Sequence, residues 1–423
     1  MHRVLIACDK FKGSATALEV AEALRRGLLE ARPDAEVVVL PIADGGEGTV
    51  DAALAAGVAV GAAGSAAPGP AQDAAGALLG TAAPAFEERR CTVTGPYGEI
   101  CEARFALDPR TGAAVIEVAE ACGLRLVDTA ALRAGDLDAT AATSAGVGEL
   151  IVAALDAGAR SIVLGLGGSA TTDGGSGMLA ALGLRITDAA GEPVGPGGAG
   201  AALATRIDAA GLDPRLSRTR ILVASDVVNP LCGGDGAAAV YGPQKGVTPE
   251  RIPEIDAGLA RFGALIEREL GAAPGEWTRR PGAGAAGGLG FAALAVLRGE
   301  LRPGIDLVLD LLGFDAVVAG ADLVITGEGR LDEQTLSGKA PAGVAVRAGG
   351  APVVVVCGSS ALPRERAVAA GFREVFELVS IEADAERCIR EPLPLLEEIG
   401  RLIGASELTG VSERSLGSGP KHR

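Results

Sequence analysis

Histidine is nearly absent from the chain. Its 423 residues include two histidines, His2 and His422, at the extreme ends of the sequence. Histidine is the side chain most often used as a general base and as a zinc ligand. The sequence therefore argues against a histidine base and against a histidine-ligated zinc ion. Proton transfer is left to carboxylates or lysine, and any metal ion should be a hard, oxygen-liganded ion such as Mg²⁺.

Other scarce features exclude further classes of protein. No stretch reaches the roughly 18 uninterrupted apolar residues of a membrane span, so no membrane partner is expected. The seven cysteines are scattered singly without a C-x-x-C pair, and no signal peptide is visible, which predicts a reducing, cytoplasmic location. The net charge of −16 argues against nucleic-acid binding. An anionic small molecule stays open, because local cations can outweigh the charge of the whole chain.

The P-loop pattern G-x-x-x-x-G-K-[ST] is also missing. Gly338-Lys339 comes nearest to it, but Glu333 occupies the first glycine position and Ala340 the last. A nucleotide that binds to this chain must therefore be held by another kind of loop.

Glycine is abundant, with 63 residues, and many of the glycines follow short apolar runs. Apolar runs without alternation are typical of parallel strands that are buried on both faces. At both ends of the chain such strands alternate with amphipathic stretches, which indicates right-handed βαβ units in a parallel sheet. The predicted strands are 4–7, 36–42, 321–326, 352–357 and 375–381, and the predicted helices include 17–31, 50–56 and 307–318.

The middle of the chain predicts a second α/β domain. Residues 91–106 are typical of a β-hairpin whose turn is Gly95-Pro-Tyr-Gly98. Residues 161–166 and 221–224 are short apolar runs that predict buried strands.

The resulting fold prediction is two α/β domains in a discontinuous arrangement. A flavodoxin-like parallel-sheet domain is formed by 1–58 and 291–405, and a second α/β domain, 59–290, is inserted into it. The polar segment 406–423 is predicted to be a disordered tail.

Charged or glycine-rich loops follow four of the predicted strands of the discontinuous domain. Their sequences are DKFKGS from Asp9, ADGGEGT from Ala43, GEGRLDEQ from Gly327 and GSS from Gly358. In an open α/β sheet, ligands bind beyond the carboxyl ends of the strands. The loops therefore predict a ligand site at one edge of the sheet, although capped turns at helix starts would explain some of them as well.

A longer glycine loop, 165–176, follows the predicted strand 161–166. Such a loop leading to a helix offers backbone N–H groups to an anion. It also matches the dinucleotide fingerprint G-x-G-x-x-G/A, and Asp188 lies about 20 residues further on, where a ribose-binding acid would stand. Against a dinucleotide, Asp173-Gly-Gly175 interrupts the position where the helix should begin. A purely structural glycine turn is the remaining alternative.

Three further segments carry weaker signals. Asp226 and Lys245 lie in loops fixed by glycine and proline, and either loop alone is ordinary. The segment 281–290 also reads G-x-G-x-x-G, but no strand precedes it. We interpret it as a flexible joint or as the entry to a helix.

Taken together, these loops resemble those of the bacterial glycerate kinase family, typified by the glycerate 2-kinases. The similarity runs from Val4 to about Val379 and leaves the segment 60–84 and the tail outside it. The motifs that carry it, in chain order, are DKFKGSATALEVAEAL, ADGGEGTVDA, VTGPYGE, LGLGGSATTDGGSGML, SDVVNPLCG, YGPQKG, GAGAAGGLG, LRPGIDLV and DLVITGEGRLDEQTLSGKAP. The resemblance implies transfer of the γ-phosphoryl group of ATP to D-glycerate with Mg²⁺, in a cleft between two α/β domains.

On this resemblance the 165–176 loop is expected to hold the phosphates of ATP. The expected contacts are backbone N–H groups around Gly167 and Gly168 and the hydroxyls of Ser169 and Thr171. Carboxylates would bind Mg²⁺, and the candidates are Asp173, Asp226 and Glu328.

The acceptor substrate needs a cation for its carboxylate and a base for its hydroxyl. Lys12, Lys245 and Arg330 are the candidate cations, with Asp9 also expected in the substrate site. Because histidine is lacking, the proton should pass to Asp44 or Asp173, and Lys12 is a further catalytic candidate.

Alternatives to this function are a kinase of another small hydroxy acid, a dinucleotide-dependent oxidoreductase and a periplasmic-type binding protein. The family favours 2-phosphoglycerate as product, but the residues do not distinguish it from 3-phosphoglycerate. A homo-oligomer is left open.

Overall fold

The computed structural model describes residues 2–62, 85–135 and 137–408. The chain divides into two compact units. The first draws on Met1–Asp44, Asp51–Pro84 and Val308–Arg423, and the second on Gly45–Val50 and Ala85–Leu307. The domain boundaries predicted above, after 58 and after 290, stay predictions. Most of the predicted tail, 409–423, lies outside the described residues.

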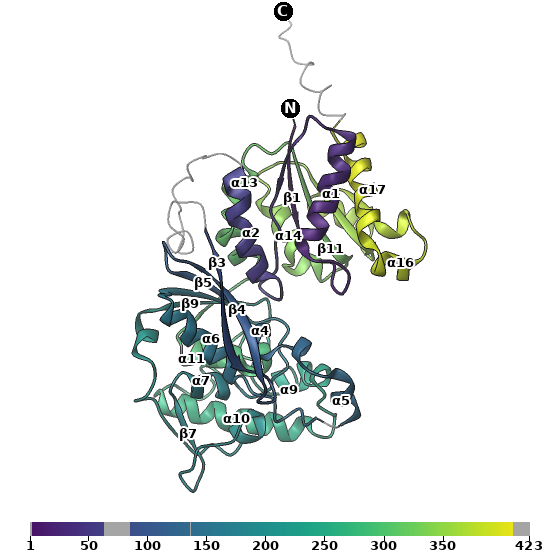
Figure 1. Cartoon of the computed structure of the whole chain (residues 1–423). Helices are drawn as coiled ribbons and strands as arrows, with labels where there is room; N and C mark the ends of the chain where they lie inside the picture. Colours follow the sequence, from purple (N-terminus) through teal and green to yellow (C-terminus); the bar gives the residue numbers. More distant parts are fainter. Residues whose placement is uncertain (1, 63–84, 136, 409–423) are drawn as a thin grey trace, which may run out of the picture. The chain divides into compact units, whose positions relative to one another are not determined.

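The first unit is built on a five-stranded parallel sheet (Figure 1). Its strands are β1 (Arg3–Cys8), β2 (Glu36–Val39), β11 (Leu323–Leu331), β12 (Val353–Ser360) and β13 (Phe372–Glu377). Their order in the sheet is β13-β12-β11-β1-β2, with every pair parallel. This is the flavodoxin-like order 2-1-3-4-5, so the predicted fold class is confirmed.

Helices flank this sheet. They are α1 (Ala17–Ala31), α2 (Thr49–Ala62), α12 (Gly304–Leu311), α13 (Phe314–Val318), α14 (Ala340–Arg347), α15 (Arg364–Ala369), α16 (Ala385–Arg390) and α17 (Pro392–Ser406), with 3₁₀ turns η5 (Thr335–Ser337) and η6 (Leu378–Ser380). The first residues of α2 and of α12 are assigned to the second unit.

Helix α1 has the bounds that its apolar spacing predicted. Thr16 and Glu19 form a reciprocal capping box at its start, which satisfies N–H groups that lack a partner in the helix. Helix α17 lies side by side with α1 (Figure 1). Gly27 and Gly400 permit this close packing, because a Cβ at Gly27 would meet the Glu397 carbonyl oxygen at 1.8 Å and a Cβ at Gly400 would meet the Leu24 carbonyl oxygen at 2.4 Å.

Strand β11 is longer than predicted. The sequence placed its end at Thr326 and a loop from Gly327 onward, but the strand continues to Leu331. The register with β12 explains the difference, because Glu328 pairs with Cys357 and Leu331 with Ser360. The backbone of this glycine-rich stretch thus finds ladder hydrogen bonds that local sequence does not reveal. The predicted helix 307–318 is likewise two helices, α12 and α13, separated at Gly313, which has a φ of +64°.

The second unit has a six-stranded mixed sheet in the order β10-β9-β6-β5-β4-β3. Its strands are β3 (Glu87–Thr94), β4 (Ile100–Asp108), β5 (Ala113–Glu117), β6 (Ser161–Gly165), β9 (Arg220–Ala224) and β10 (Glu300–Arg302), and β7 (Arg185–Thr187) and β8 (Arg206–Asp208) form a separate pair. Strands β3 and β4 are the predicted hairpin, which is confirmed. Strands β5, β6, β9 and β10 are parallel to one another.

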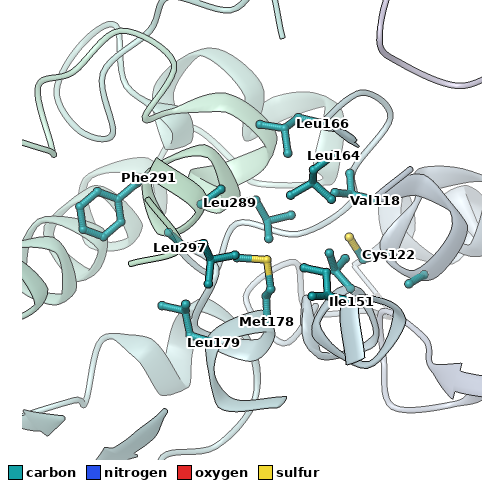
Figure 2. Packing of buried hydrophobic residues seen from close by; sticks show 14 of the residues in the cluster. Val118, Cys122, Ile151, Leu164, Leu166, Met178, Leu179, Leu289, Phe291 and Leu297 are labelled. Carbon is teal, nitrogen blue, oxygen red and sulfur yellow. The ribbon is translucent and has the colours of Figure 1, made fainter. Parts of the chain in front are cut away.

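The helices of the second unit are α4 (Ala119–Cys122), α5 (Thr129–Ala134), α6 (Ala145–Asp156), α7 (Ser176–Ala181), α8 (Gly197–Ala201), α9 (Ala237–Tyr241), α10 (Ile252–Glu269) and α11 (Leu289–Ala295), with 3₁₀ turns η1 (Leu124–Leu126), η2 (Pro214–Arg218), η3 (Pro243–Lys245) and η4 (Ala285–Gly288). Leu164, Ile151, Met178 and Leu289 from four different elements meet in its core (Figure 2). This core fixes the strand and helix ends that carry the loops described next.

No helix of the described residues is long and apolar enough to cross a membrane.

Candidate active site

The glycine turn after β6 presents three consecutive backbone N–H groups. Within the described residues, the N–H groups of Gly167, Gly168 and Ser169 make no hydrogen bond. Gly168 is exposed and has a φ of +74°, a conformation that glycine adopts without strain. The turn is held on its other side, because Leu124 N donates to Gly168 O at 2.9 Å and Ala170 N donates to Cys122 O at 2.7 Å. Successive unpaired N–H groups of this kind form a concave anion site.

Lys245 supplies a buried cation beside this turn. Its side chain is 2% exposed, and Nζ donates to Ser169 Oγ at 2.9 Å and to the Thr171 carbonyl oxygen at 2.7 Å. Burial lowers the pKa of Lys245 to about 8, opposed by the charges of Cys122 and Asp173. No carboxylate of the described residues forms an ion pair with it. A buried lysine without a carboxylate partner is suited to an anionic ligand.

Asp173 is fully buried and saturated with hydrogen bonds. Its Oδ2 accepts from Ser144 N at 2.9 Å, from Ser144 Oγ at 2.7 Å and from Gly177 N at 3.2 Å. Its Oδ1 accepts from Gly175 N at 2.9 Å. The carboxylate thus joins the starts of α6 and α7. The predicted role of Asp173 as a base or metal ligand stays untested, and these bonds favour a positioning role for it.

The segment 281–290 packs against the same loop. Gly174 N donates to the Gly287 carbonyl oxygen at 3.0 Å, and a Cβ at Gly287 would meet the Thr171 carbonyl oxygen at 2.0 Å. Gly287 and Gly288 are buried, and α11 begins at Leu289. The interpretation of this segment as the entry to a helix is therefore confirmed, and its interpretation as a flexible joint stays a prediction.

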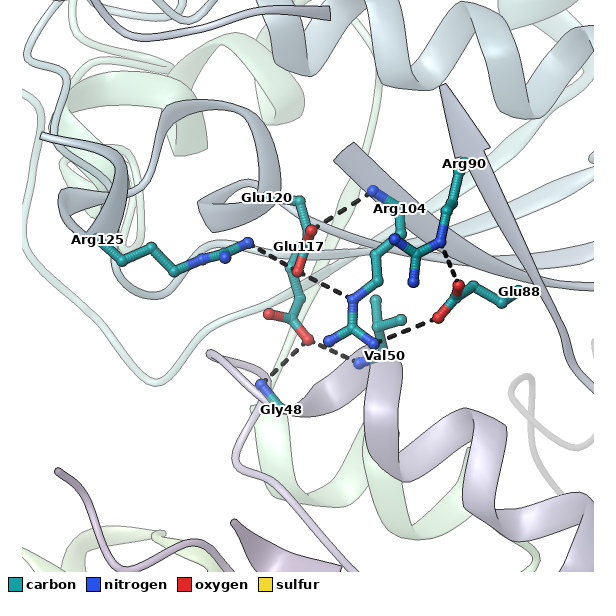
Figure 3. Close-up of polar contacts among 8 residues, drawn as sticks. All are labelled: Gly48, Val50, Glu88, Arg90, Arg104, Glu117, Glu120 and Arg125. Atoms are coloured by element: carbon teal, nitrogen blue, oxygen red, sulfur yellow. Dashed lines mark hydrogen bonds and ion pairs between the residues drawn. The ribbon is translucent and has the colours of Figure 1, made fainter. Parts of the chain in front are cut away.

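Gly45–Val50 belongs to the second unit and lies on the glycine loop. A Cβ at Gly165 would meet the Gly45 carbonyl oxygen at 2.5 Å, and a Cβ at Gly167 would meet Gly46 Cα at 2.6 Å. The buried Glu117, at the end of β5, accepts hydrogen bonds from Gly48 N and Val50 N through Oε1 (Figure 3). Only glycine allows backbones to approach this closely.

Asp226 lies just after β9 and is exposed. Its Oδ1 accepts a hydrogen bond from Gly304 N at 3.0 Å, at the start of α12. Asp188, the acid expected of a dinucleotide fold, follows β7, whose partner is the antiparallel β8 rather than a strand of the large sheet. Its carboxylate closes a local turn by accepting from Ala190 N and Glu192 N. Helix α7 also begins only at Ser176, so the dinucleotide pattern lacks its structural context.

In the first unit, Asp9, Asp44 and Glu328 come together at the carboxyl ends of the strands. Asp9 follows β1, and its N–H donates to the Gly327 carbonyl oxygen of β11 at 2.9 Å. The pKa of Asp9 is raised to about 7, mainly by burial and also by the charges of Asp44 and Glu328, while the charge and the backbone N–H of Lys10 oppose this rise. Burial also raises the pKa of Glu328. These acids therefore share one electrostatic environment.

The partners of Glu328 were not foreseen from the sequence. Thr335 is fully buried and donates its hydroxyl to Glu328 Oε1, and Lys339 Nζ lies 4.0 Å from Oε2. The two lower the pKa of Glu328 against the effect of burial. Thr335 is only seven residues from Glu328 in the chain. The contact was missed because the strand was predicted to end at Thr326, before Glu328, whereas β11 continues to Leu331.

The predicted cations of the first unit remain on the surface. Lys12 is exposed, and its side chain makes no hydrogen bond or ion pair within the described residues. Arg330 is 71% exposed and lies 3.9 Å from the Asp332 carboxylate. The backbones of the two segments are adjacent, because a Cβ at Gly329 would lie 3.4 Å from Lys12 N. Both side chains are available to a carboxylate ligand.

Glu117 and Ser144 are the functional candidates that sequence reasoning missed. Glu117 ends the apolar run AAVIE, and a charge at the end of a buried strand was a readable signal. Ser144 had no such signal, because its partner Asp173 lies 29 residues away.

The raised pKa of Asp9 gives a testable pH dependence. Between about pH 4 and pH 7 the unfolded chain loses the Asp9 proton while the folded chain keeps it, so the free energy of unfolding should fall as pH rises. Asp9→Asn removes this dependence. Relative to the natural chain, the variant should gain stability between pH 5 and pH 8, on the order of a few kcal/mol, since one pKa unit corresponds to about 1.4 kcal/mol.

Denaturant unfolding of the ligand-free protein at several pH values measures this gain. Glu365→Gln removes an exposed acid of the same unit and serves as the control. A constant difference between Asp9→Asn and the natural chain across this pH range would contradict the burial of an ionisable Asp9.

The fold and these sites define a class before any comparison is made. Two α/β units carry, in one, a glycine turn with a buried lysine and, in the other, clustered acids with exposed cations at strand ends. These are the features of an α/β enzyme that handles anionic small molecules.

Comparison with known proteins identifies the family. The profile of the glycerate kinase family matches residues 4–83 and 75–406. The chain therefore belongs to the glycerate kinase family, a family of kinases. The match runs through most of the segment 60–84, which the motif comparison had wrongly left outside the resemblance.

Individual relatives are similar to this chain over most of its length. The glycerate kinase of Bacillus subtilis is 41% identical over 408 residues, covering 96% of this chain and 97% of that protein. The glycerate 2-kinase of Escherichia coli is 42% identical over 359 residues, covering 84% of this chain and 85% of that protein. A crystal structure described as that of a glycerate kinase 2 from Salmonella typhimurium LT2 has a TM-score of 0.77 at 40% identity, covering 97% of this chain and 99% of that one.

Proposed function

We propose that the enzyme transfers the γ-phosphoryl group of ATP to D-glycerate and forms 2-phosphoglycerate, with Mg²⁺ as cofactor. The observation that carries this proposal is the glycine turn at Gly167–Ser169 beside the buried Lys245. The names of the relatives supply the acceptor, and the glycerate 2-kinase of Escherichia coli supplies the position of the phosphate. A cytoplasmic location stays a prediction from the sequence.

The phosphates of ATP are proposed to bind at the turn. Phosphoryl transfer needs positioning and charge neutralisation more than covalent help from the protein. Three N–H groups without a partner in the described residues can donate to phosphate oxygens, and Lys245 Nζ, two of whose contacts go to Ser169 and Thr171, has a third proton to donate. The start of α7 is less suited to binding phosphate, because Gly175 N and Gly177 N already donate to the carboxylate of Asp173.

Magnesium fits the chemistry of the acids available. No group of three or more histidine, cysteine, aspartate or glutamate side chains within the described residues is arranged to hold a metal ion. Mg²⁺ that arrives on phosphates needs only one or two protein carboxylates. Asp226 and Glu328 stay the proposed carboxylates. These carboxylates would hold the ion, which would supply positive charge against the charge that develops on the phosphates during transfer.

The acceptor acid is proposed to use the strand ends of the first unit. Lys12 and Arg330 are exposed cations suited to its carboxylate, Arg330 through two parallel hydrogen bonds. Asp44 is the proposed base for the hydroxyl proton. Asp9 is a second candidate, because a pKa of about 7 matches the working pH of a general base.

A coupled assay with ATP, Mg²⁺ and D-glycerate tests the function, with the product identified by phosphorus NMR. We expect 2-phosphoglycerate, and no turnover when Mg²⁺ is chelated. Formation of 3-phosphoglycerate would correct the position of transfer. If ATP is consumed only with another hydroxy acid, the acceptor is wrong, and if no phosphoryl group leaves ATP with any of them, the proposal fails.

A further inference from the structure

Glu117 is a buried acid that the mechanism above does not use. It is 3% exposed and pairs with Gly165 in the parallel ladder of β5 and β6, next to the glycine turn. Its Oε1 lies 3.1 Å from Gly48 N and 2.7 Å from Val50 N. A buried carboxylate costs free energy unless such donors satisfy it.

These bonds fix a short segment rather than a whole helix. Gly48 has a φ of +97°, and the Thr49 hydroxyl donates to the Gly46 carbonyl oxygen at 2.7 Å. Glu117 therefore holds the end of a tight turn whose beginning, Gly45-Gly46, rests on Gly165 and Gly167. The acids Asp44 and Glu47 flank these two glycines in the chain.

The glycine turn itself does not depend on Glu117. It is held by the backbone bonds of Gly168 and Ala170 to the chain at Cys122 and Leu124, and by Lys245 through Ser169. Loss of Glu117 should therefore free Gly45–Val50 while the turn keeps its shape. The neighbouring Glu120 differs, because its partners are Arg104 and Arg125 (Figure 3).

We propose that Glu117 is a positioning residue that clamps Gly45–Val50 onto the glycine turn and so places Glu47 of that segment, and Asp44 directly before it, for phosphoryl transfer. The proposal rests on the proposed function. It makes a specific kinetic prediction: removing the clamp lowers kcat and leaves KM for ATP almost unchanged. An error of about 1 Å in the placement of a reacting group can cost about 100-fold in rate.

Three variants test the clamp in the full-length protein. Glu117→Ala should lower kcat about 100-fold with KM for ATP within about threefold of the natural enzyme. Glu117→Gln keeps a carbonyl oxygen that can accept from both N–H groups, so it should restore kcat to within about tenfold. Glu120→Ala is the matched control, a buried acid three residues further along the chain, and should leave kcat within about twofold, because Gly48 N and Val50 N donate to Glu117 and not to Glu120.

Amide hydrogen exchange without ligands gives a second readout. Gly48 and Val50 should exchange faster in Glu117→Ala and stay protected in Glu117→Gln, and this readout also decides if Glu117→Ala is too unstable to assay. Unchanged exchange, unchanged kcat, or a KM for ATP that rises in step with the loss of kcat would overturn the clamp. If the natural enzyme transfers no phosphoryl group, the proposed function fails, and the exchange rates still decide whether Glu117 holds the segment.

Discussion

Replacing Lys245 with methionine is expected to lower kcat/KM for ATP by about 10²- to 10³-fold, the effect of losing one preorganised donor to charge that develops in the transition state. Lys245 is 2% exposed and holds Ser169 and Thr171 at the glycine turn. Methionine has a similar length and no charge, so the fold should persist although Ser169 Oγ and the Thr171 carbonyl oxygen each lose a donor, and thermal unfolding checks this. Steady-state kinetics with ATP varied gives the effect.

Gln244→Met is the matched control, because Gln244 is exposed on the same 3₁₀ turn and receives the same new side chain. It should leave kcat/KM unchanged.

The charge of Lys245 can also be removed by raising the pH. Since burial lowers the pKa of Lys245 to about 8, kcat/KM for ATP should fall as pH rises through that value, because this parameter reports groups of the free enzyme. Near-natural activity of Lys245→Met would remove Lys245 from the phosphate site.

Asp173→Asn is expected to abolish activity through loss of stability. One of the two oxygens becomes an NH₂ group that faces the N–H of Gly175 or the donors of Ser144 and Gly177. The free energy of unfolding should fall by about 3 kcal/mol, because a hydrogen bond to a charged group is worth about 1.5–3 kcal/mol and an unpaired buried donor costs about 1–3 kcal/mol. Denaturant unfolding measures the loss.

Asp188→Asn serves as the control for the same change at a turn. One oxygen of Asp188 accepts from both Ala190 N and Glu192 N, and an asparagine can keep both bonds. A base role for Asp173 makes the opposite prediction, in which Asp173→Asn binds ATP and unfolds like the natural protein but does not turn over. That result would support Asp173 as the catalytic base.

The parts of the fold that could be read from sequence are those with local causes. Helix α1 has the predicted bounds because apolar spacing and the Thr16 cap both act within a few residues. The hairpin of β3 and β4 follows from its glycine-proline turn. The end of β11 was misplaced because its ladder partner, Ser360, is 29 residues away from Leu331 and invisible to a local pattern.

The sequence by itself determined which types of side chain are available for chemistry. With histidine confined to the chain ends, it left carboxylates and lysines as the candidates for proton transfer, and it predicted ligand sites at the glycine loops. It could not say which acids are reactive and which hold the structure. Only the tertiary structure decided that Asp173 is saturated by four hydrogen bonds and that Lys245 is buried at the glycine turn. The physical reason is that the charge state of a side chain depends on burial and on donors brought from distant segments, and residue type and spacing specify neither.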